Sequence, residues 1–229
     1  MTNDTVRGVA LRRGKKRADD VFMVRTAPKI PATCYAADPG LKKGRKYLVG
    51  YVGVMGSADG VHHLLEAAAA IIKLGRKDIQ FLLMGTGPEY ERLLELRRTL
   101  GLEAFVDLPG WMKGEPLFRA LQTIDLGVSC DPKNGYNDAC TMNKVLEYMA
   151  FGKPQVMFDL VESKASADQA GWYVTEGSVP KLAEAIVHLL DNPELRRRMG
   201  EIGAERFKKL VNWDHSVEQL ERAYAKAVS

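Results

Sequence analysis

The chain has 229 residues, of which 46% are hydrophobic and 27% are charged, as in an ordinary globular protein with an ample core. No apolar run approaches the ~20 residues of a transmembrane helix, and the polar, basic first residues predict no secretory signal. The net charge of +4 divides into +8 through Lys46, from twelve Lys or Arg against four Asp, and −4 in the remainder. The three cysteines, Cys34, Cys130 and Cys140, show neither metal-like spacing nor an even count, so we expect reduced thiols in a cytoplasmic protein.

The basic leader through Lys46 could contact anionic lipid headgroups or another acidic surface, or it could be only a solvated arm. Few aromatic residues interleave its charges, so we do not expect it to bind nucleic acid. Peripheral contact with the inner face of a membrane remains open.

The first 45 residues have little regular pattern. Residues 2–17 predict a short helix that ends at Gly14, and residues 21–24 predict a brief strand. Prolines and weak periodicity from 27 to 44 indicate a linker or an extended crossing segment. This opening does not resemble the start of a self-sufficient fold. We therefore assign residues 1–45 to the remnant of a preceding domain plus a linker, and residues 46–229 to one domain.

From residue 46 onward, short apolar runs alternate with amphipathic segments. The apolar runs predict strands at 47–53, 79–84, 105–108, 126–130, 155–158 and 171–174. The 3.6-residue periodicity predicts helices at 61–74, 89–100, 115–122, 141–152, 179–190, 193–210 and 214–227. This order is typical of an α/β fold with a doubly wound parallel sheet, Rossmann-like in architecture. Ligands of such sheets lie beyond the carboxyl ends of the strands, which selects the loops at 53–60, 85–88, 109–113 and 131–141.

The predicted helix at 141–152 has the most site-like arrangement in the chain. Thr141 is the expected N-cap, and glycine and proline at 152 and 154 end the helix. Asn143, Lys144 and Glu147 are spaced to lie side by side on its polar face. Since a helix N-terminus offers free N–H groups and partial positive charge, it suits an anion. The alternative is a solvated face with a Lys–Glu pair.

The other loops give weaker signals by themselves. The loop at 53–60, GVMGSADG, is rich in glycine and suits close approach to a phosphate, but it matches neither the dinucleotide nor the P-loop pattern. A tight structural turn is an equal alternative. The loop at 131–141 is polar enough to recognise sugar hydroxyl groups, or it is a solvated Asx-rich turn. Its acidic residues lack calcium-loop spacing, so we expect no metal site.

Taken together, these stretches resemble the C-terminal, donor-binding half of glycosyltransferase family 4, the retaining GT-B enzymes. The match rests on GYVGVMGSADGVHHLLEAAAAI at 50–71, FLLMGTGPEYERLLELRRTLGLEAFVDLPGWM at 81–112 and DLGVSCDPKNGYNDACTMNKVLEYMAFGKPQVMFDL at 125–160. The MNK-x-x-EYMA-x-GKP form resembles the branch that builds capsular and O-antigen-type polysaccharides.

The resemblance implies roles for individual residues. Glu147 matches the second glutamate of the family's Glu-x7-Glu element, which binds the nucleotide ribose. Lys144 is placed to meet the donor diphosphate, and the family's first glutamate falls at Ala139, so that Asp138 is its candidate substitute. The family's Arg and Lys after the first strand fall near Val54 and Asp59, neither of which is basic. The remaining site residues that we expect from this resemblance and from the loops are Gly56, Ser57, Gly110, Trp111, Asn137, Thr141, Asn143 and Arg25, the last as a substitute cation.

The expected function is transfer of a sugar from a UDP- or GDP-sugar to a saccharide or lipid-linked acceptor, without a metal or other cofactor. The family carries an N-terminal, acceptor-binding domain of comparable size, so we expect a truncated transferase, a fragment or half of a split enzyme. The alternative is a non-catalytic nucleotide-sugar-binding module. An epimerase of the same architecture is disfavoured, because the MNK-x-x-E stretch resembles a transferase. We expect the whole enzyme to work in the cytoplasm, peripheral to the membrane.

Overall fold

The computed structural model describes residues 1–28, 30, 35–175 and 177–228. In these residues, six parallel strands form a central sheet. Their order across the sheet is β3-β2-β1-β4-β5-β6. The strands are β1 (Tyr47–Val52), β2 (Ile79–Met84), β3 (Val106–Gly110), β4 (Leu126–Ser129), β5 (Gln155–Phe158) and β6 (Gly171–Val174). Since β4 returns to the other side of β1, the chain reverses direction across the sheet between these two strands. The expected doubly wound α/β fold is confirmed.

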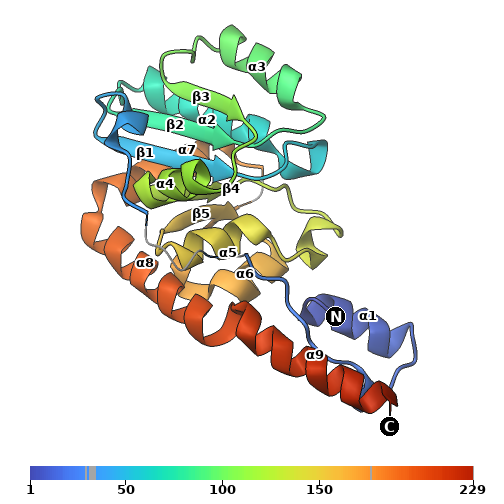
Figure 1. Cartoon of the computed structure of the whole chain (residues 1–229). Coiled ribbons are helices and arrows are strands. Elements are labelled where there is room, and N and C mark those ends of the chain that lie inside the picture. The colour runs from blue at the N-terminus through green and yellow to red at the C-terminus, as the bar shows by residue number, and fades with distance from the viewer. Residues whose placement is uncertain (29, 31–34, 176, 229) are drawn as a thin grey trace.

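The central strands are continuous apolar runs, because helices cover both faces of the sheet and every side chain of these strands is therefore buried. Every residue of β1, β2, β4 and β5 is buried. One apolar core lies under α2 (Val61–Lys73), α3 (Tyr90–Thr99) and α7 (Val179–Asp191). Smaller clusters lie on the other face, under α4 (Glu115–Thr123) and α5 (Asn143–Ala150). Figure 1 shows α4 and α5 in front of the sheet and α2 and α7 behind it.

Three further helices follow or flank this core. They are α6 (Val161–Ala167), α8 (Pro193–Arg206) and α9 (Trp213–Val228). A short π-helical turn, Phe207–Val211, separates α8 from α9, whereas the sequence predicted one helix over 193–210. The sequence also missed α6, because VESKASA is short, polar and without helical periodicity.

Two local predictions at other positions were wrong. Residues 21–24 form no strand, because Val24 N–H bonds the carbonyl oxygen of Met1 and the segment does not reach the sheet. Helix α5 begins at Asn143 rather than at Thr141, and its N-cap is Met142, without a capping side chain. Gly152 adopts the left-handed conformation with φ of 62°, which ends the helix near its predicted stop.

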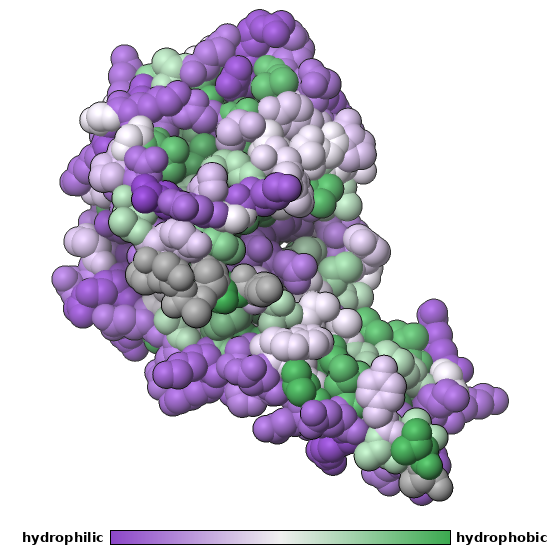
Figure 2. Space-filling model, viewed as in Figure 1, coloured by the Kyte–Doolittle hydropathy of each residue, from purple (hydrophilic) through white to green (hydrophobic). Residues whose placement is uncertain are grey.

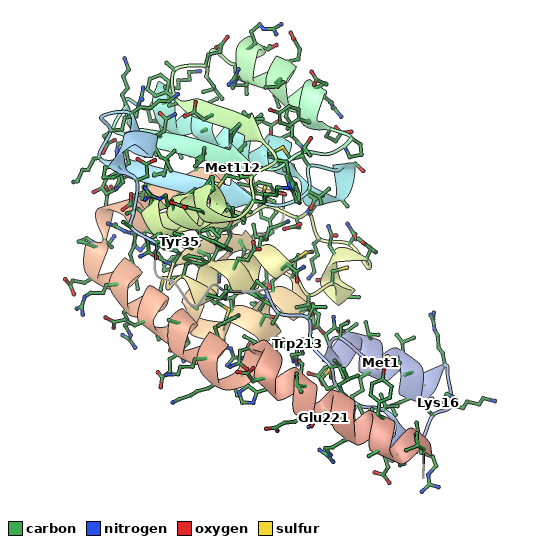
Figure 3. The ribbon with its side chains drawn as sticks, in the orientation of Figure 1. Met1, Lys16, Tyr35, Met112, Trp213 and Glu221 are labelled. Atoms are coloured by element: carbon green, nitrogen blue, oxygen red, sulfur yellow. The ribbon has the colours of Figure 1, made fainter. Side chains whose placement is uncertain are left out.

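The first residues and the last helix lie side by side, below the sheet in Figure 1. Helix α1 (Asp4–Arg12) precedes a segment that is tied to α9, since Lys226 Nζ lies 2.7 Å from Asp20 Oδ1 and Ser216 Oγ donates to the Arg25 carbonyl oxygen. Figure 2 shows apolar residues gathered over this region, and Figure 3 places Met1 and Trp213 at the junction of α1 and α9. The division into domains at residue 45 stays a prediction.

Among the described residues, none of the helices combines the length and the apolar character that crossing a bilayer requires. Cys130 and Cys140 are free thiols. Cys34 lies outside the described residues.

Candidate functional site

A cavity of about 660 Å³ lies where the chain reverses direction across the sheet, at the carboxyl ends of the strands. This is the position where open α/β sheets place their ligands. The loops after β1, β2, β3 and β4 and the first turns of α5 supply its walls. The lining residues are Val52, Gly53, Val54, Ala58, Asp59, Met84, Gly85, Trp111, Met112, Lys113, Gly114, Leu117, Asp131, Tyr136, Asn137, Cys140, Thr141, Met142, Asn143, Lys144 and Glu147.

Glycines allow the loops to converge on the cavity. A Cβ at Gly85 would lie 1.8 Å from the carbonyl oxygen of Gly53, so only glycine lets these two loops meet. Gly60 has φ of 62°, and a Cβ there would lie 2.3 Å from the carbonyl oxygen of Cys130. The glycine-rich loop therefore serves first to press the segment after β1 against the neighbouring loops.

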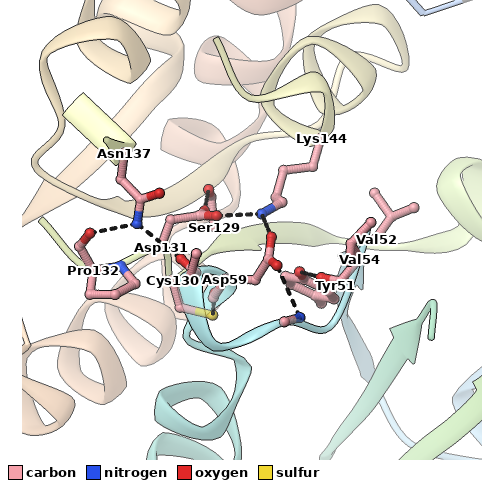
Figure 4. A network of polar contacts seen from close by, with 12 residues as sticks. Tyr51, Val52, Val54, Asp59, Ser129, Cys130, Asp131, Pro132, Asn137 and Lys144 are labelled. Atoms are coloured by element: carbon pink, nitrogen blue, oxygen red, sulfur yellow. Dashed lines mark hydrogen bonds and ion pairs between the residues drawn. The ribbon is translucent and has the colours of Figure 1, made fainter. Parts of the chain in front are cut away.

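Lys144 is the centre of a buried ion network, drawn in Figure 4. Its Nζ donates to Asp131 Oδ1 at 2.6 Å and to Asp59 Oδ1 at 3.3 Å. The side chains of Lys144 and Asp131 are only 7% and 2% exposed, whereas that of Asp59 is 22% exposed. The ammonium also lies 5.2 Å from the ring centroid of Tyr51. Because the bond to Asp131 is the shorter one and both of its side chains are buried, Asp131 is the principal partner of Lys144.

The two carboxylates are themselves held in place. Asp131 Oδ2 accepts a hydrogen bond from Ser129 Oγ at 2.5 Å, and Asp59 Oδ2 accepts one from Gly56 N–H at 3.0 Å. Burial opposes the charge of Lys144, but Asp131 and Asp59 outweigh it, so the pKa of Lys144 is raised above its ordinary value. Lys144 is therefore a fixed cation at neutral pH.

Glu147 lies one turn along α5 from Lys144 and lines the same cavity. Burial raises its pKa to about 7, and the charge of Lys144 offsets part of this effect. The carboxyl group makes no hydrogen bond or ion pair with the described residues, in contrast to Asp59 and Asp131. It is therefore free to bond a ligand in the cavity.

Other predicted residues form the wall beside α5. Asn137 is buried, and its Nδ2 donates to the carbonyl oxygens of Ala58 and Pro132. Thr141 and Asn143 line the cavity just ahead of Lys144, and Trp111 lies at the rim with 65% of its surface exposed. The structure thus brings Lys144, Glu147, Asn137, Thr141, Asn143 and Trp111 together.

The remaining predicted residues lie outside the lining of the cavity. Asp138 Oδ1 accepts hydrogen bonds from Lys133 Nζ at 2.9 Å and from the N–H of Val161 at 3.1 Å. Arg25 Nη2 pairs with Asp4 Oδ2 at 3.1 Å. Gly56, Ser57 and Gly110 are absent from the lining, although each adjoins or lies near a residue that contributes to it. The expectation that Asp138 replaces the missing glutamate or that Arg25 adds charge has no support from this geometry.

Sequence reasoning did not select Asp59 and Asp131 as site residues, although they orient the key cation. A signal was available for Asp131, since it follows β4 by two residues and polar side chains after parallel strands point to the ligand edge. Asp59 lies in the loop after β1, which carries the same signal, but its contact with Lys144 spans 85 residues and no local pattern relates the two.

The arrangement is suited to binding an anion next to a hydroxylated group. The buried cation and the uncapped N–H groups at the start of α5 are suited to an anion, and the carboxyl group of Glu147 can accept from hydroxyl groups. Within the described part of the chain, His, Cys, Asp and Glu form no group of three that could hold a metal ion.

Comparison with known proteins identifies a family. Residues 46–192 match the family described as glycosyl transferases group 1. The chain is 33% identical over 159 residues to alpha-D-kanosaminyltransferase of Streptomyces kanamyceticus, an overlap of 69% of this chain and 40% of that protein.

Solved structures show the same fold at lower identity. A mutant of Staphylococcus aureus TarM, in complex with fondaparinux, alpha-GlcNAc-glycerol and UDP, has a TM-score of 0.78 at 18% identity and matches 97% of this chain and 43% of its own. The C-terminal domain of a Francisella tularensis glycosyl transferase group 1 family protein, LpcC, has a TM-score of 0.64 at 17% identity, with 80% of this chain and 98% of that domain covered. The chain thus spans less than half the length of the kanosaminyltransferase and of TarM.

Proposed function

The chain belongs to the family of group 1 glycosyl transferases, and on that premise we propose that its cavity binds the nucleotide diphosphate of an activated sugar. One observation carries the proposal. Lys144, Glu147 and the N-terminus of α5 line a single cavity at the carboxyl edge of the sheet. The likeness to the LpcC domain supports its assignment as the donor-binding half of a GT-B enzyme.

Lys144 contacts the diphosphate in this proposal. Its bond to Asp59 is longer than its bond to Asp131, 3.3 Å against 2.6 Å, and Asp59 is the more exposed acid. An incoming phosphate oxygen therefore takes the place of Asp59, while Asp131 keeps the ammonium in position. During transfer, negative charge develops on the leaving nucleotide. The fixed ammonium and the N–H groups of α5 stabilise that charge and align the donor, with retention of configuration at the sugar.

Glu147 binds the ribose of the nucleotide. The carboxyl group of Glu147 has no partner among the described residues, and Glu147 lies one helical turn along α5 from Lys144. A nucleotide whose diphosphate contacts Lys144 therefore places its ribose beside the carboxyl group of Glu147. Trp111, at the rim of the cavity, borders the base. The donor is a UDP- or GDP-sugar, and UDP in the TarM complex makes UDP the first probe. No metal or other cofactor takes part.

The acceptor is a saccharide or a lipid-linked saccharide, in line with the polysaccharide-building branch that the MNK-x-x-EYMA stretch resembles. A second candidate is a non-catalytic donor-binding module or half of a split enzyme. The specific observation that favours it is coverage, because the chain spans only 40% of the kanosaminyltransferase. We also propose that the whole enzyme works peripheral to the inner face of a membrane, with the basic leader as the candidate contact; the alternative is that this leader is only a solvated arm.

Calorimetric titration with UDP and with GDP tests the donor site. Lys144→Met should weaken binding by about 1.5–3 kcal/mol, because a charge-assisted contact to phosphate is lost. Lys164→Met is the matched control, since its Nζ pairs with exposed Asp159 at 2.7 Å outside the cavity. Equal affinities for the unaltered protein and Lys144→Met would remove Lys144 from the site, and absence of binding to both nucleotides would refute the proposal.

Turnover separates the two candidate functions. The protein is incubated with UDP- and GDP-sugars, and release of the nucleotide is measured with and without saccharide acceptors. Release by this chain supports a transferase. Binding without release supports the module, and release only after addition of a separate acceptor-binding polypeptide supports the split enzyme.

A further inference from the structure

Asn3 is buried although it stands near the start of a basic, mostly exposed segment. It is only 1% exposed, whereas none of the residues of α1, which it caps, is buried. A polar side chain in such a position must satisfy its hydrogen-bonding groups within the protein. The contacts of Asn3 therefore show what this burial achieves.

The amide of Asn3 divides its bonds between two parts of the molecule. Its Oδ1 accepts from the N–H of Val6 at 2.9 Å, which caps its own helix. Its Nδ2 donates to the carbonyl oxygen of Ala139 at 2.8 Å and to Thr141 Oγ1 at 3.1 Å. These two bonds join residues that are 136 and 138 positions apart, and they reach the segment that forms the cavity wall ahead of α5.

The segment from Ala139 to Met142 depends on outside support. Helix α5 has no side-chain cap of its own, since its N-cap is Met142. Asn137 fixes the cavity side of the wall through the carbonyl oxygens of Ala58 and Pro132. Asn3 holds the opposite side. Lys144 follows only three residues after Thr141, so the position of this wall sets where its ammonium enters the cavity.

Two further contacts attach the same N-terminal segment to α6 and to the start of α5. Thr5 donates both its N–H and its Oγ1 to Glu162 Oε1 of α6, at 3.0 and 2.6 Å. Thr26 Oγ1 lies 3.4 Å from Asn143 Oδ1, at the first residue of α5. The N-terminal segment thus contacts the chain on both sides of the N-terminal boundary of α5, at Thr141 through Asn3 and at Asn143 through Thr26.

From these contacts we infer that Asn3 is a positioning residue for the donor site, acting through Ala139 and Thr141 on the start of α5. This inference rests on the proposed function, in which the start of α5 meets the nucleotide diphosphate. It assigns the first residues of the chain a part in ligand binding, although they contribute no residue to the cavity lining.

Asn3→Asp separates the two roles of the amide. Aspartate is an equally good N-cap, so the bond to Val6 is kept, but it has no N–H to donate to Ala139 and Thr141. Asn3→Ser is the second, uncharged variant, because serine also caps and is too short to replace both bonds. Asp4→Asn is the matched control, since it removes the ion pair with Arg25 and a negative charge in the first turn of α1 but leaves the bonds of Asn3 in place.

Amide hydrogen exchange in the nucleotide-free protein is the first measurement. The amides of Asp138, Ala139 and Cys140 bond the carbonyl oxygens of Asn134, Tyr136 and Asn137, and they should exchange faster in both Asn3 variants than in Asp4→Asn. In Asn3→Ser and Asp4→Asn, which bury no charge, the melting temperature should stay within a few degrees of that of the unaltered protein, because α1 buries none of its residues. Unchanged exchange in the wall would overturn the inference.

Titration with UDP is the second measurement. Both Asn3 variants should bind UDP about fivefold more weakly, because the binding free energy falls by about the contribution of one hydrogen bond. The Kd for UDP should be unchanged in Asp4→Asn. Faster exchange with an unchanged Kd would also overturn the inference. If the unaltered protein bound neither UDP nor GDP, the proposed function would fail, while the exchange data would still show whether Asn3 fixes the wall.

Discussion

Removal of the Lys144 charge should destabilise the fold as well as weaken ligand binding. In Lys144→Met, the carboxylate of Asp131 keeps its bond to Ser129 but loses the cation at 2.6 Å, in a position that leaves it 2% exposed. Loss of one partner of a buried ion pair typically costs about 3–5 kcal/mol, since the other charge stays buried and unpaired. Asp59 is less affected, because it is partly exposed and bonds the N–H of Gly56.

The cost is measured by urea unfolding at pH 7, followed by circular dichroism. We expect Lys144→Met to lose about 3–5 kcal/mol in the free energy of unfolding, and the control Lys164→Met to lose less than about 1 kcal/mol, because its pair is exposed. The double variant Lys144→Met with Asp131→Asn should recover at least half of the loss, since it leaves no unpaired charge at the pair. A loss below about 1 kcal/mol in Lys144→Met would refute the assignment of a buried, charged pair.

Two further predictions concern buried groups next to the cavity. Because the pKa of Glu147 is raised from 4.5 to about 7 in the fold, its ionisation opposes folding, and this penalty grows as pH rises through that range. Glu147→Gln should therefore differ little from the unaltered protein in unfolding free energy at pH 4, below both pKa values, and exceed it at pH 8 by an upper limit of about 3 kcal/mol. An equal difference at both pH values would contradict the shift. Tyr148 is fully buried, and its hydroxyl bonds Val52 of β1 and Val128 of β4. Tyr148→Phe should lower the free energy of unfolding in urea by about 1–3 kcal/mol. The control Tyr173→Phe should cost less, because the hydroxyl bond of Tyr173 is exposed. A cost for Tyr148→Phe no larger than that of the control would show that the N–H of Val52 finds another partner.

The sequence predicted the sheet well because its strands are buried on both faces. The predicted ranges for β2, β5 and β6 agree with the structure at both ends, and those for the other strands differ by one or two residues. Short continuous apolar runs are typical of strands in a parallel sheet that is covered on both faces. Helix α6 was missed because its stability comes from packing against α5 and from the bond of Glu162 to Thr5, neither of which leaves a periodic pattern.

The site was predicted only in part, since the direction of a loop side chain depends on distant partners. Lys144 and Glu147 line one cavity, as their helical spacing predicts, and their roles stay predictions. Asp138 was expected in the cavity, but Lys133 and the first turn of α6 hold its carboxylate elsewhere. Thr141 was expected to cap α5, yet its hydroxyl accepts from Asn3 instead. These contacts join residues that no local pattern relates.

The placement of the cavity on loops has an evolutionary consequence. Val54, Asp59 and Ala139, at or near which the charged residues of the family pattern fall, all lie in loops or single 3-10 turns outside the strands and α-helices. The residues of β1 and β4, which are all buried, do not include these positions. Mutation at these positions can exchange one set of ligand contacts for another without disturbing the sheet. In the proposed function, donor preference can therefore diverge among relatives whose architecture stays the same.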